Sequence, residues 1–539
     1  MKKIQTALIS VTDKTGLVEF TEQLRAINPS LRLIASGGTA AALKVSYTPL
    51  HEYTEFPECF SGRVKTLHPK IMGGILQRRG TDDKEALALK IAPIDLVVCN
   101  LYDFAKAARE MPKEGDCETL IEQMDIGGSS LIRSACKNFA HVAVVIDPRD
   151  YPLLIEELTT HEGETSLEFR RYLAVKAIQA SAAYEALLAR ELSMRLLEEK
   201  VEHLDLRKGK ELRYGENPDQ RGWVYELPGA HGIVQSKILS GKELSYNNYE
   251  DATVAYEAVQ SLEPLHPLFA VAIVKHGNLC GFSTGDTEVQ AFEKAWQGDP
   301  KSAFGGIIAF YAPATEALIP SLNKKFFEVL IAPQFDEALI AWIKSTKPSV
   351  RLLETTKRSE YPISYKSISG GVLAQTKKQN PITSLTRLLE PCDPAAPKKI
   401  GVVTQKLPDP KQCGLCAFGI ASVNFAKSNT IAIVREYSPG CYQLLGMGSG
   451  QPNRVDSLER LAIPKAIDNL RLENSCDLSG ALLVSDGFFP FDDSIKTAAL
   501  HGITCCIQPG GSNNDPSVIA AADDNEMSMI FTGERYFNH

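Results

Sequence analysis

The segment "IQTALISVTDKTGLVEFTEQLRAI", from Ile4 to Ile27, decides the fold of the first part of the chain. It begins with a short apolar run, passes through a polar turn at 12–16, and continues with apolar residues spaced three and four apart. These two patterns are typical of a buried strand and an amphipathic helix. A strand followed by a helix is the repeating unit of a parallel sheet.

Further segments repeat this pattern within the first two hundred residues. The apolar run at 31–36 leads through paired glycines into "TAAALKV", and the run at 141–148 leads into "DYPLLIEEL"; a third run occupies 94–102. Such alternation predicts α/β architecture, a doubly wound parallel sheet with helices on both faces. A helical apolar period over 165–199 predicts a long helix that closes a first domain at residues 1–199.

Polar residues and glycines at the predicted strand ends indicate an anion site. Ser36, Gly38 and Thr39 occupy one strand-to-helix turn, and Ser10 and Lys14 occupy the equivalent turn of the first strand. Backbone N–H groups and the helix dipole at such turns favour a phosphate. A tight turn needs glycine even without a ligand, so that alternative stays open here.

Two basic segments lie between these elements. The segment 61–76 carries Arg63 and Lys65 together with proline and paired glycines, which predicts a loop presenting positive charge. The segment 122–138 combines Asp125 with basic residues and another glycine pair. A solvated basic loop would have the same composition.

Length and composition limit the class of protein. The 539 residues predict three or four compact units at roughly 150 residues each. With 58 Lys+Arg against 66 Asp+Glu, the net charge of -8 argues against a general nucleic-acid or anionic-membrane binder. No apolar run approaches the roughly 18 residues that span a membrane. The 12 cysteines are mostly scattered singly, which fits a reducing cytoplasm.

The second part, 200–539, contains one strand whose end attracts attention. In "PLFAVAIVKHGNLCG", from Pro267 to Gly281, an apolar run stops at Lys275 and His276. Ligands of open α/β sheets bind beyond the carboxyl ends of strands, so this pair is a candidate for substrate contact. The alternative is a strand that simply surfaces there. A proline- and lysine-containing connector at 376–399 predicts a boundary between two subdomains.

Several common chemistries lack their motifs. The chain has no Walker A, His-Glu-x-x-His or Gly-x-Ser-x-Gly sequence. Cys413-x-x-Cys416 has no second cysteine pair, and the His-x-Glu of a zinc deaminase is missing. The cluster "DGFFPFDD" around Phe488 is either core beside a turn or a wall for a flat ring.

Taken in order, these motifs resemble the family of bifunctional purine biosynthesis proteins, which join an IMP cyclohydrolase to an aminoimidazole carboxamide ribonucleotide (AICAR) formyltransferase. The resemblance extends over essentially the whole chain. Its motifs are "SVTDKTGLVEF", "ASGGTAAAL", "GRVKTLHPKI", "CNLYDF", "DIGGSSLIRSACKN", "LRYGENPDQ", "GKELSYNN", "VKHGNLCG", "SAFGGIIAF", "AKSNTIAIV", "GSGQPNRVDS", "SDGFFPFDDS", "PGGSNND" and "GERYFNH".

The resemblance implies a methylglyoxal-synthase-like cyclohydrolase domain at 1–199. It implies a formyltransferase at 200–539, built from two zinc-less cytidine-deaminase-like α/β subdomains. The protein is then expected to be a cytoplasmic homodimer with formyltransferase sites at the subunit interface, binding neither nucleic acid nor membrane. Its ligands would be AICAR, formyl-AICAR, IMP and reduced folate, with 10-formyltetrahydrofolate as co-substrate. No catalytic metal is implied, and a structural monovalent cation is allowed.

The resemblance also assigns residues to the two reactions. In formyl transfer, His276 would move a proton, Lys275 would supply positive charge, and Asn429 would hold the formyl oxygen. Further substrate contacts of this reaction would be Arg213, Tyr214, Asn248, Arg454, Phe488, Asp493 and Arg535. The cyclisation centre would consist of Lys65, Thr66, Tyr102, Asp125 and Lys137. Nucleotide contacts of the cyclisation would be Ser10, Lys14, Ser36, Gly38, Thr39, Arg63 and Asn100.

Three positions depart from the family pattern. Asp219 replaces a His, which affects the expected transfer rate, while Leu279 and Asp103 each replace a Pro and would change loop stiffness. Two other functions are weighed against this one. The first domain could be a regulatory anion-binding module, although its reacting-centre residues are present, and the second part could be a zinc nucleoside deaminase.

Overall fold

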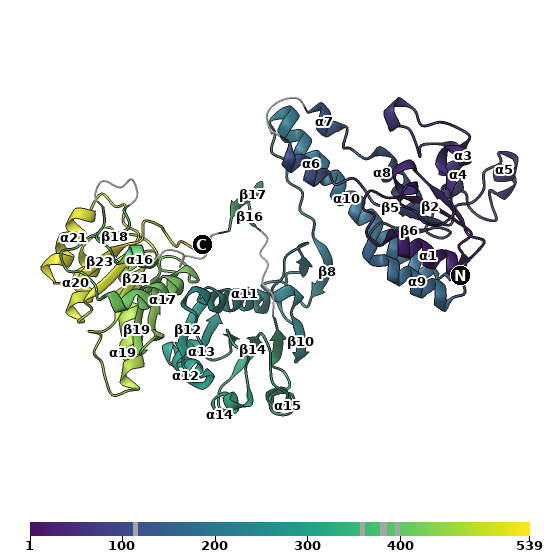
Figure 1. Cartoon of the computed structure of the whole chain (residues 1–539). Coiled ribbons are helices and arrows are strands. Elements are labelled where there is room, and N and C mark those ends of the chain that lie inside the picture. The colour runs from purple at the N-terminus through teal and green to yellow at the C-terminus, as the bar shows by residue number, and fades with distance from the viewer. Residues whose placement is uncertain (112–116, 356–361, 378–384, 394–398) are drawn as a thin grey trace. The chain divides into compact units, whose positions relative to one another are not determined.

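The computed structural model describes residues 1–111, 117–355, 362–377, 385–393 and 399–539 (Figure 1). The chain divides into two compact units, residues 1–205 and 206–539. The first unit therefore ends a few residues beyond the expected position 199, because the chain continues as coil after its last helix.

A five-stranded parallel sheet forms the centre of the first unit, which confirms the prediction of parallel strands. Its order is β4-β3-β2-β5-β6. The strands are β2 (Thr6–Ser10), β3 (Arg32–Ala35), β4 (Thr48–Pro49), β5 (Leu96–Cys99) and β6 (Ala143–Val145). From β2 the chain builds the sheet first toward β4 and then, through β5, toward β6. The order therefore reverses between β2 and β5, the point where such sheets bind ligands.

Helices cover both faces of this sheet because alternate strand residues point to opposite sides. Ala7 and Ile9 of β2 pack with α1 (Leu17–Ile27) and α9 (Tyr151–Thr160), whereas Leu8 packs with the other set. That set is α4 (Pro69–Leu76), α8 (Ile126–Lys137) and α10 (Leu167–Leu197). The long helix predicted over 165–199 is thus confirmed as α10.

Shorter elements complete the first unit. The two-stranded sheet of β1 (Lys2–Lys3) and β7 (Glu164–Thr165) lies apart from the main sheet. The remaining helices are α2 (Gly37–Ala40), α3 (Leu50–Thr54), α5 (Asp83–Ala88), α6 (Phe104–Glu110) and α7 (Glu118–Ile121).

The prediction of a loop over 61–76 was wrong for its second half, which forms α4. His68 caps this helix by accepting the N–H of Lys70 on its side chain at 3.2 Å, and Pro69 takes the first helical position. A Cβ on Gly74 would lie 2.8 Å from the carbonyl oxygen of Ala92. The paired glycines therefore permit close packing of a helix, and do not mark a loop.

The second unit is organised around a twelve-stranded mixed sheet with two mirrored halves. Its order is β10-β15-β14-β13-β11-β12-β20-β19-β21-β22-β23-β18. Each half has a central antiparallel hairpin followed outward by three strands that are parallel to one another. The halves meet where Ser283 of β12 pairs with Gln443 of β20.

The strands of the first half are β10 (Lys237–Ser240), β11 (Phe269–Lys275), β12 (Asn278–Gly285), β13 (Gly306–Phe310), β14 (Phe327–Ala332) and β15 (Arg351–Glu354). Those of the second half are β18 (Gly401–Val402), β19 (Ile431–Ser438), β20 (Cys441–Gly448), β21 (Leu482–Ser485), β22 (Cys505–Gln508) and β23 (Ser528–Phe531).

One core joins the two halves. The helix α11 (Tyr246–Gln260) precedes the first hairpin and α17 (Cys413–Asn424) precedes the second, and both helices contribute to the same cluster of buried residues. Phe282 of β12 and Phe418 of α17 stack in this cluster with ring centroids 4.9 Å apart. The opposite face is covered by α12 (Glu288–Gly298), α13 (Pro300–Ala303), α14 (Ile319–Asn323), α15 (Glu337–Thr346), α19 (Ile463–Arg471), α20 (Asp493–Leu500) and α21 (Asp515–Asp524). The short helix α18 (Arg454–Asp456) lies against α20.

Two hairpins stand outside the large sheet. One consists of β8 (Arg207–Leu212) and β9 (Gly222–Glu226), and the other of β16 (Ile363–Ile368) and β17 (Gly371–Thr376). The boundary expected at 376–399 falls partly on 378–384 and 394–398, which lie outside the described residues, and it includes α16 (Leu385–Leu388). Within the described ranges, no helix has the length and apolar character needed to cross a membrane.

Candidate active sites

In the first unit, Asn100 follows β5 and forms hydrogen bonds to the loop after β2, at the point where the strand order reverses. Its Oδ1 accepts the backbone N–H groups of Thr12 at 2.6 Å and Asp13 at 3.0 Å, and its Nδ2 donates to the carbonyl of Asp13 at 2.9 Å. The loop after β2 is thereby fixed beside the carboxyl end of β5. Lys14 belongs to this loop, with its Nζ 3.3 Å from the carbonyl of Thr12.

Three hydroxyl groups line the adjacent strand ends. Ser10 Oγ and Ser36 Oγ are 3.0 Å apart, and Thr39 Oγ1 bonds both the N–H and the carbonyl of Val11 at 2.9 and 3.1 Å. A Cβ on Gly38 would meet nothing within 4 Å, so the backbone at this turn borders open space. The structure therefore brings Ser10, Ser36, Gly38 and Thr39 together beside Lys14 and Asn100.

A second group surrounds Asp125, which caps α8. Its Oδ1 accepts the N–H of Gly128 at 2.6 Å, and its carboxylate also accepts the backbone N–H of Tyr102. Burial raises the pKa of Asp125, an effect that these two N–H groups and the charge of Lys65 oppose. A Cβ on Gly127 would lie 2.7 Å from Thr66 Oγ1. Asp125, Lys65, Thr66 and Tyr102 thus converge.

The sequence did not indicate two further groups near this centre. Tyr184 of α10 accepts the backbone N–H of Asp125 on its hydroxyl at 2.9 Å, and it is largely buried. Glu58 lies with an oxygen 3.6 Å from Lys65 Nζ. Both come from segments distant in sequence from the Asp125 motif, so no local pattern could have marked them.

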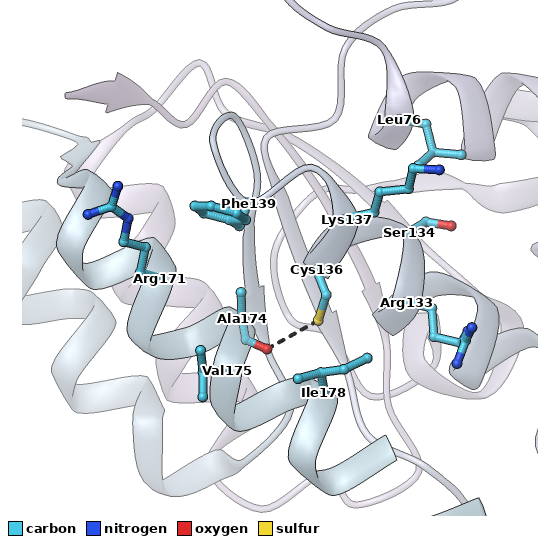
Figure 2. A pocket seen from close by; sticks show the side chains of 10 residues that line it. All are labelled: Leu76, Arg133, Ser134, Cys136, Lys137, Phe139, Arg171, Ala174, Val175 and Ile178. Carbon is cyan, nitrogen blue, oxygen red and sulfur yellow. Dashed lines mark hydrogen bonds between the residues drawn. The ribbon is translucent and has the colours of Figure 1, made fainter. Parts of the chain in front are cut away.

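Two expected residues of the first unit have other surroundings. The exposed guanidinium of Arg63 pairs with Glu122. Lys137 is the last residue of α8, twelve positions after Asp125, which separates the two by about 18 Å along the helix. Figure 2 shows Lys137 beside Arg133, Cys136 and other side chains that line a cavity of about 560 Å³.

In the second unit, Lys275 and His276 end β11 at a tight hairpin turn. Lys275 Nζ donates to the carbonyl of Phe304 at 2.7 Å, and the imidazole of His276 is exposed. The N–H groups of His276 and Gly277 donate to the carboxylate of Asp251 at 2.9 and 2.6 Å. The pair therefore sits on a fixed turn with the imidazole free to meet a ligand.

Asn278 connects this turn to the loop that carries Asn429. Its Nδ2 donates to the carbonyl of His276 at 3.1 Å, and its Oδ1 accepts the N–H of Lys427 at 3.0 Å. Asn429 Nδ2 donates to the carbonyls of Gln451 and Pro452, both at 3.0 Å. The amide hydrogens of Asn429 are thus directed at backbone, and its Oδ1 is the atom left to accept a hydrogen bond.

The sequence did not indicate Glu328 and Arg351. Both lie near the expected substrate contacts Arg213, Tyr214 and Asn248. The Arg213 guanidinium lies 4.7 Å from the centre of the Tyr214 ring. Asn248 Nδ2 donates to Glu328 Oε2 at 3.0 Å, and Arg351 Nη1 is 3.5 Å from the same oxygen. Burial lowers the pKa of Arg351, the charge of Glu328 opposes this effect, and the nearby charge of Arg213 adds to it. Glu328 is the anion that neighbours Arg351, and Arg213 adds a second positive charge close by.

Arg454 and Arg535 flank the ring of Phe537, with guanidinium-to-centroid distances of 5.7 and 5.3 Å. Arg454 Nη2 also lies 3.1 Å from Asp486 Oδ1. The C-terminal segment reaches the Asn429 loop, because Ser428 N donates to the carbonyl of Asn538 at 2.9 Å. The two arginines are therefore placed close to that loop.

The aromatic cluster divides into core and surface. Phe489 is fully buried, Phe488 is half-buried, and Phe491 is 63% exposed. Asp493 begins α20 and accepts the N–H of Ser494 at 2.6 Å. Only Phe488 and Phe491 have ring surface available for a ligand.

The three departures from the family pattern have distinct surroundings. Asp219 lies on the exposed loop between β8 and β9. Leu279 is 4% exposed and packs in the shared core, so packing holds the strand after His276. Asp103 caps α6 by accepting the N–H of Lys106 at 2.9 Å. Among the residues that the structure describes, no group of three or more His, Cys, Asp or Glu is arranged to hold a metal ion.

Comparisons with known proteins cover both units. The model of the family described as "AICARFT/IMPCHase bienzyme" matches residues 135–465, and that of the "MGS-like domain" matches residues 16–130. The bifunctional purine biosynthesis protein PurH of Persephonella marina is 39% identical over 548 residues, covering 99% of each chain. PurH of Acaryochloris marina is 39% identical over 550 residues, again covering 99% of each chain.

Among solved structures, the "Crystal structure of ForH" is 33% identical and covers 35% of this chain and 96% of its own, with a TM-score of 0.31. That score is too low to support a statement about the fold. The full-length identity to the two PurH proteins and the family model that covers more than half of the chain lead to one conclusion. The chain belongs to the AICARFT/IMPCHase family of bifunctional AICAR formyltransferases and IMP cyclohydrolases.

Proposed function

We propose that the two activities of this bifunctional enzyme of purine biosynthesis are divided between its units, cyclisation in residues 1–205 and formyl transfer in residues 206–539. This division is supported by the different candidate catalytic residues that the two units contain. A buried carboxylate with Lys65 and Tyr102 lies in the first unit, and the Lys275-His276 turn lies beside Asn429 in the second.

In formyl transfer, the 5-amino group of AICAR attacks the formyl carbon of 10-formyltetrahydrofolate. A C–N bond forms to AICAR, the bond from the formyl carbon to N10 breaks, and N10 receives a proton as tetrahydrofolate leaves. His276 takes the proton of the attacking amine, since its exposed imidazole can accept a proton on a ring nitrogen. Lys275 stabilises the negative charge that develops on the formyl oxygen.

We assign Asn429 to the amine of AICAR, although the resemblance gave it the formyl oxygen. The formyl oxygen needs a hydrogen-bond donor, and both amide hydrogens of Asn429 point to backbone carbonyls. Its Oδ1 can accept a hydrogen from the attacking 5-amino group and orient the nitrogen lone pair toward the formyl carbon.

The other expected substrate contacts of the second unit are assigned to different parts of AICAR and the folate according to their charge and shape. Arg213, with Tyr214 and the neighbouring Arg351, provides positive charge for the AICAR phosphate, and Asn248 with Glu328 provides polar contacts. Arg454 and Arg535 contribute charge near the Asn429 loop. Phe488 and Asp493 are proposed as the wall on the folate side.

In cyclisation, the carboxamide nitrogen of formyl-AICAR attacks the formyl carbon and water is lost. Asp125 exchanges protons with the reacting nitrogen and oxygen, a role that suits a carboxyl whose pKa burial raises. Lys65, Thr66 and Tyr102 orient the reacting groups. The nucleotide phosphate and ribose are assigned to Arg63 and to the residues gathered at the ends of the strands. These residues are Ser10, Lys14, Ser36, Gly38, Thr39 and Asn100.

Lys137 fits this centre only in an assembly. Since α8 separates it from Asp125 of the same chain, a second copy in the proposed homodimer would have to supply it. The homodimer with formyltransferase sites at its interface, the cytoplasmic location and the two cytidine-deaminase-like subdomains remain parts of this proposal. The mirrored halves of the large sheet support the two subdomains.

The residues around Asp486 fit the structural monovalent cation that the family resemblance allows. Asp486 is fully buried, its Oδ1 faces Arg454, and its Oδ2 has no hydrogen-bond partner among the described residues. A buried carboxylate oxygen without a donor is costly unless a cation or water satisfies it. We therefore propose Asp486 as the carboxylate that would hold such a cation.

Half-reaction assays of two variants test the division of activities. His276→Ala should lose formyl transfer from 10-formyltetrahydrofolate while it still cyclises supplied formyl-AICAR. Lys65→Ala should do the reverse. If either variant loses both activities in a folded state, or if His276→Ala transfers formyl at the wild-type rate, the assignment is wrong.

A further inference from the structure

One carboxylate holds the backbone of the turn that carries His276. Asp251 lies in the second turn of α11, and its Oδ2 accepts the N–H of His276 at 2.9 Å. Its Oδ1 accepts the N–H of Gly277 at 2.6 Å. Each oxygen of the carboxylate therefore fixes one of the two successive N–H groups in the turn.

This turn has a backbone conformation that residues other than glycine adopt infrequently. His276 has φ 54° and Gly277 has φ 72°, so both lie in the left-handed region. Two successive residues with positive φ are typical of a type I′ hairpin turn, whose first position favours Asn, Asp or Gly. Because the conformation is unfavourable for His, contacts from outside the turn must maintain it.

The second side of the turn is fixed as well. Asn278 binds the carbonyl of His276 at 3.1 Å, so the N–H and the C=O of His276 each have a partner while its imidazole stays exposed. One helical turn before Asp251, Asn248 contacts Glu328 in the group proposed to bind AICAR. The helix α11 thus places the AICAR contacts and the support of His276 on one face.

We propose that Asp251 is a positioning residue for formyl transfer, fixing the His276–Gly277 turn so that the imidazole meets the 5-amino group of AICAR. Asp251 does not touch substrate in this proposal. Its two oxygens are occupied by the backbone, and its effect on the reaction passes through His276. The inference rests on the proposed role of His276 in formyl transfer.

Steady-state kinetics of Asp251→Ala and Asp251→Asn test the proposal in the full-length enzyme. We expect kcat of formyl transfer to fall about tenfold or more in both variants, because misplacing a catalytic group by about 1 Å costs this much or more. The amide of Asp251→Asn retains one acceptor oxygen and turns an NH₂ group toward the other N–H. KM for AICAR and for the folate should stay within about threefold, since their contacts are intact.

Two controls accompany these variants. Glu257→Ala removes another carboxylate of α11, one that pairs with Lys377 at 3.5 Å, and should leave formyl transfer within about twofold of wild type. Cyclisation of supplied formyl-AICAR should be unchanged in every variant. If Asp251→Ala does not fold, Asp251→Asn carries the test, because it preserves the size of the side chain.

A double variant separates this inference from the proposed function. If Asp251 acts only through His276, adding Asp251→Ala to His276→Ala costs no further activity. An equal loss in both backgrounds would overturn the inference, as would a wild-type kcat for Asp251→Asn. In both of these cases a strong defect of His276→Ala would leave the proposed function standing. A His276→Ala enzyme that transfers formyl normally would instead overturn the proposed function itself.

Discussion

Asn278 Oδ1 accepts the backbone N–H of Lys427 at 3.0 Å. This bond joins the turn after β11 to the loop before β19, which are 149 residues apart in sequence. It places His276 of one half of the second unit next to Asn429 of the other half. The candidate formyltransferase site therefore lies at the seam between the two mirrored halves of the sheet.

Asn278→Ala should impair formyl transfer and leave cyclisation unchanged. The variant removes both the acceptor for Lys427 and the donor to the His276 carbonyl, so the two sides of the site lose their common anchor. We expect kcat of transfer to fall about tenfold or more. Asn278→Asp, which retains an acceptor for Lys427, should lose less; an equal loss in both variants would contradict a bridging role of Oδ1.

Asp125→Asn should abolish cyclisation and stabilise the first unit at neutral pH. Burial raises the pKa of Asp125 in the folded state, so the fold binds its proton more tightly than the unfolded chain does. The Asp125 carboxyl therefore contributes to the stability of the fold fully below its pKa in the unfolded chain, near 3.8. This contribution is lost as pH rises through its pKa in the folded state. Asn keeps an oxygen for the N–H of Gly128 without the buried charge.

Thermal unfolding of this variant and of wild type at pH 7 and pH 4 measures the effect. The gain in Tm of the variant should be larger at pH 7 than at pH 4, and cyclisation should fall at least about a hundredfold. A larger gain at pH 4, or cyclisation near the wild-type rate, would show that the buried carboxyl does not have the assigned role.

Arg351→Ala should weaken AICAR binding with little change in kcat. The mostly buried side chain of Arg351 lies beside Glu328 and near Arg213, where it adds charge to the proposed phosphate contacts. Losing one charge-assisted contact corresponds to about a tenfold rise in KM for AICAR. Arg351→Lys should recover part of this loss. An unchanged KM in Arg351→Ala would exclude Arg351 from the nucleotide contacts.

Thermal unfolding in potassium salts tests the role of Asp486. A monovalent cation bound beside the unpartnered Oδ2 would stabilise the folded second unit. The Tm of this unit in the wild-type enzyme should then be higher in K⁺ than in a bulky organic cation at equal ionic strength. Asp486→Asn should remove this dependence. A wild-type Tm that is insensitive to the cation, or a variant that keeps the full response, would count against the site.

The sequence was sufficient where structure depends on local pattern. Alternating strand and helix periods predicted the parallel sheet, and strand-end residues such as Ser10 and Ser36 were expected to meet because parallel strands end at one edge. The loop predicted at 61–76 does not form over its second half, because Gly74 allows α4 to approach the backbone of Ala92 and does not form a turn.

Contacts between distant segments could not be predicted in the same way. Glu328, Arg351 and Asp251 have no motif of their own, and their roles depend on strand order and on the placement of α11. Conversely, Asp125 and Lys137 are neighbours in one sequence motif, yet the helix between them holds them apart within a chain.

The most direct test of the separation of the two sites mixes two variants, each of which alone cannot convert AICAR to IMP. Lys65→Ala should convert AICAR and 10-formyltetrahydrofolate to formyl-AICAR without forming IMP, and His276→Ala should form neither product. In an equimolar mixture, formyl-AICAR released by the first enzyme should be cyclised by the second, and IMP should appear after a lag. If Lys65→Ala accumulates no formyl-AICAR, or if the mixture forms no IMP, the two activities are not carried by independent sites as this account requires.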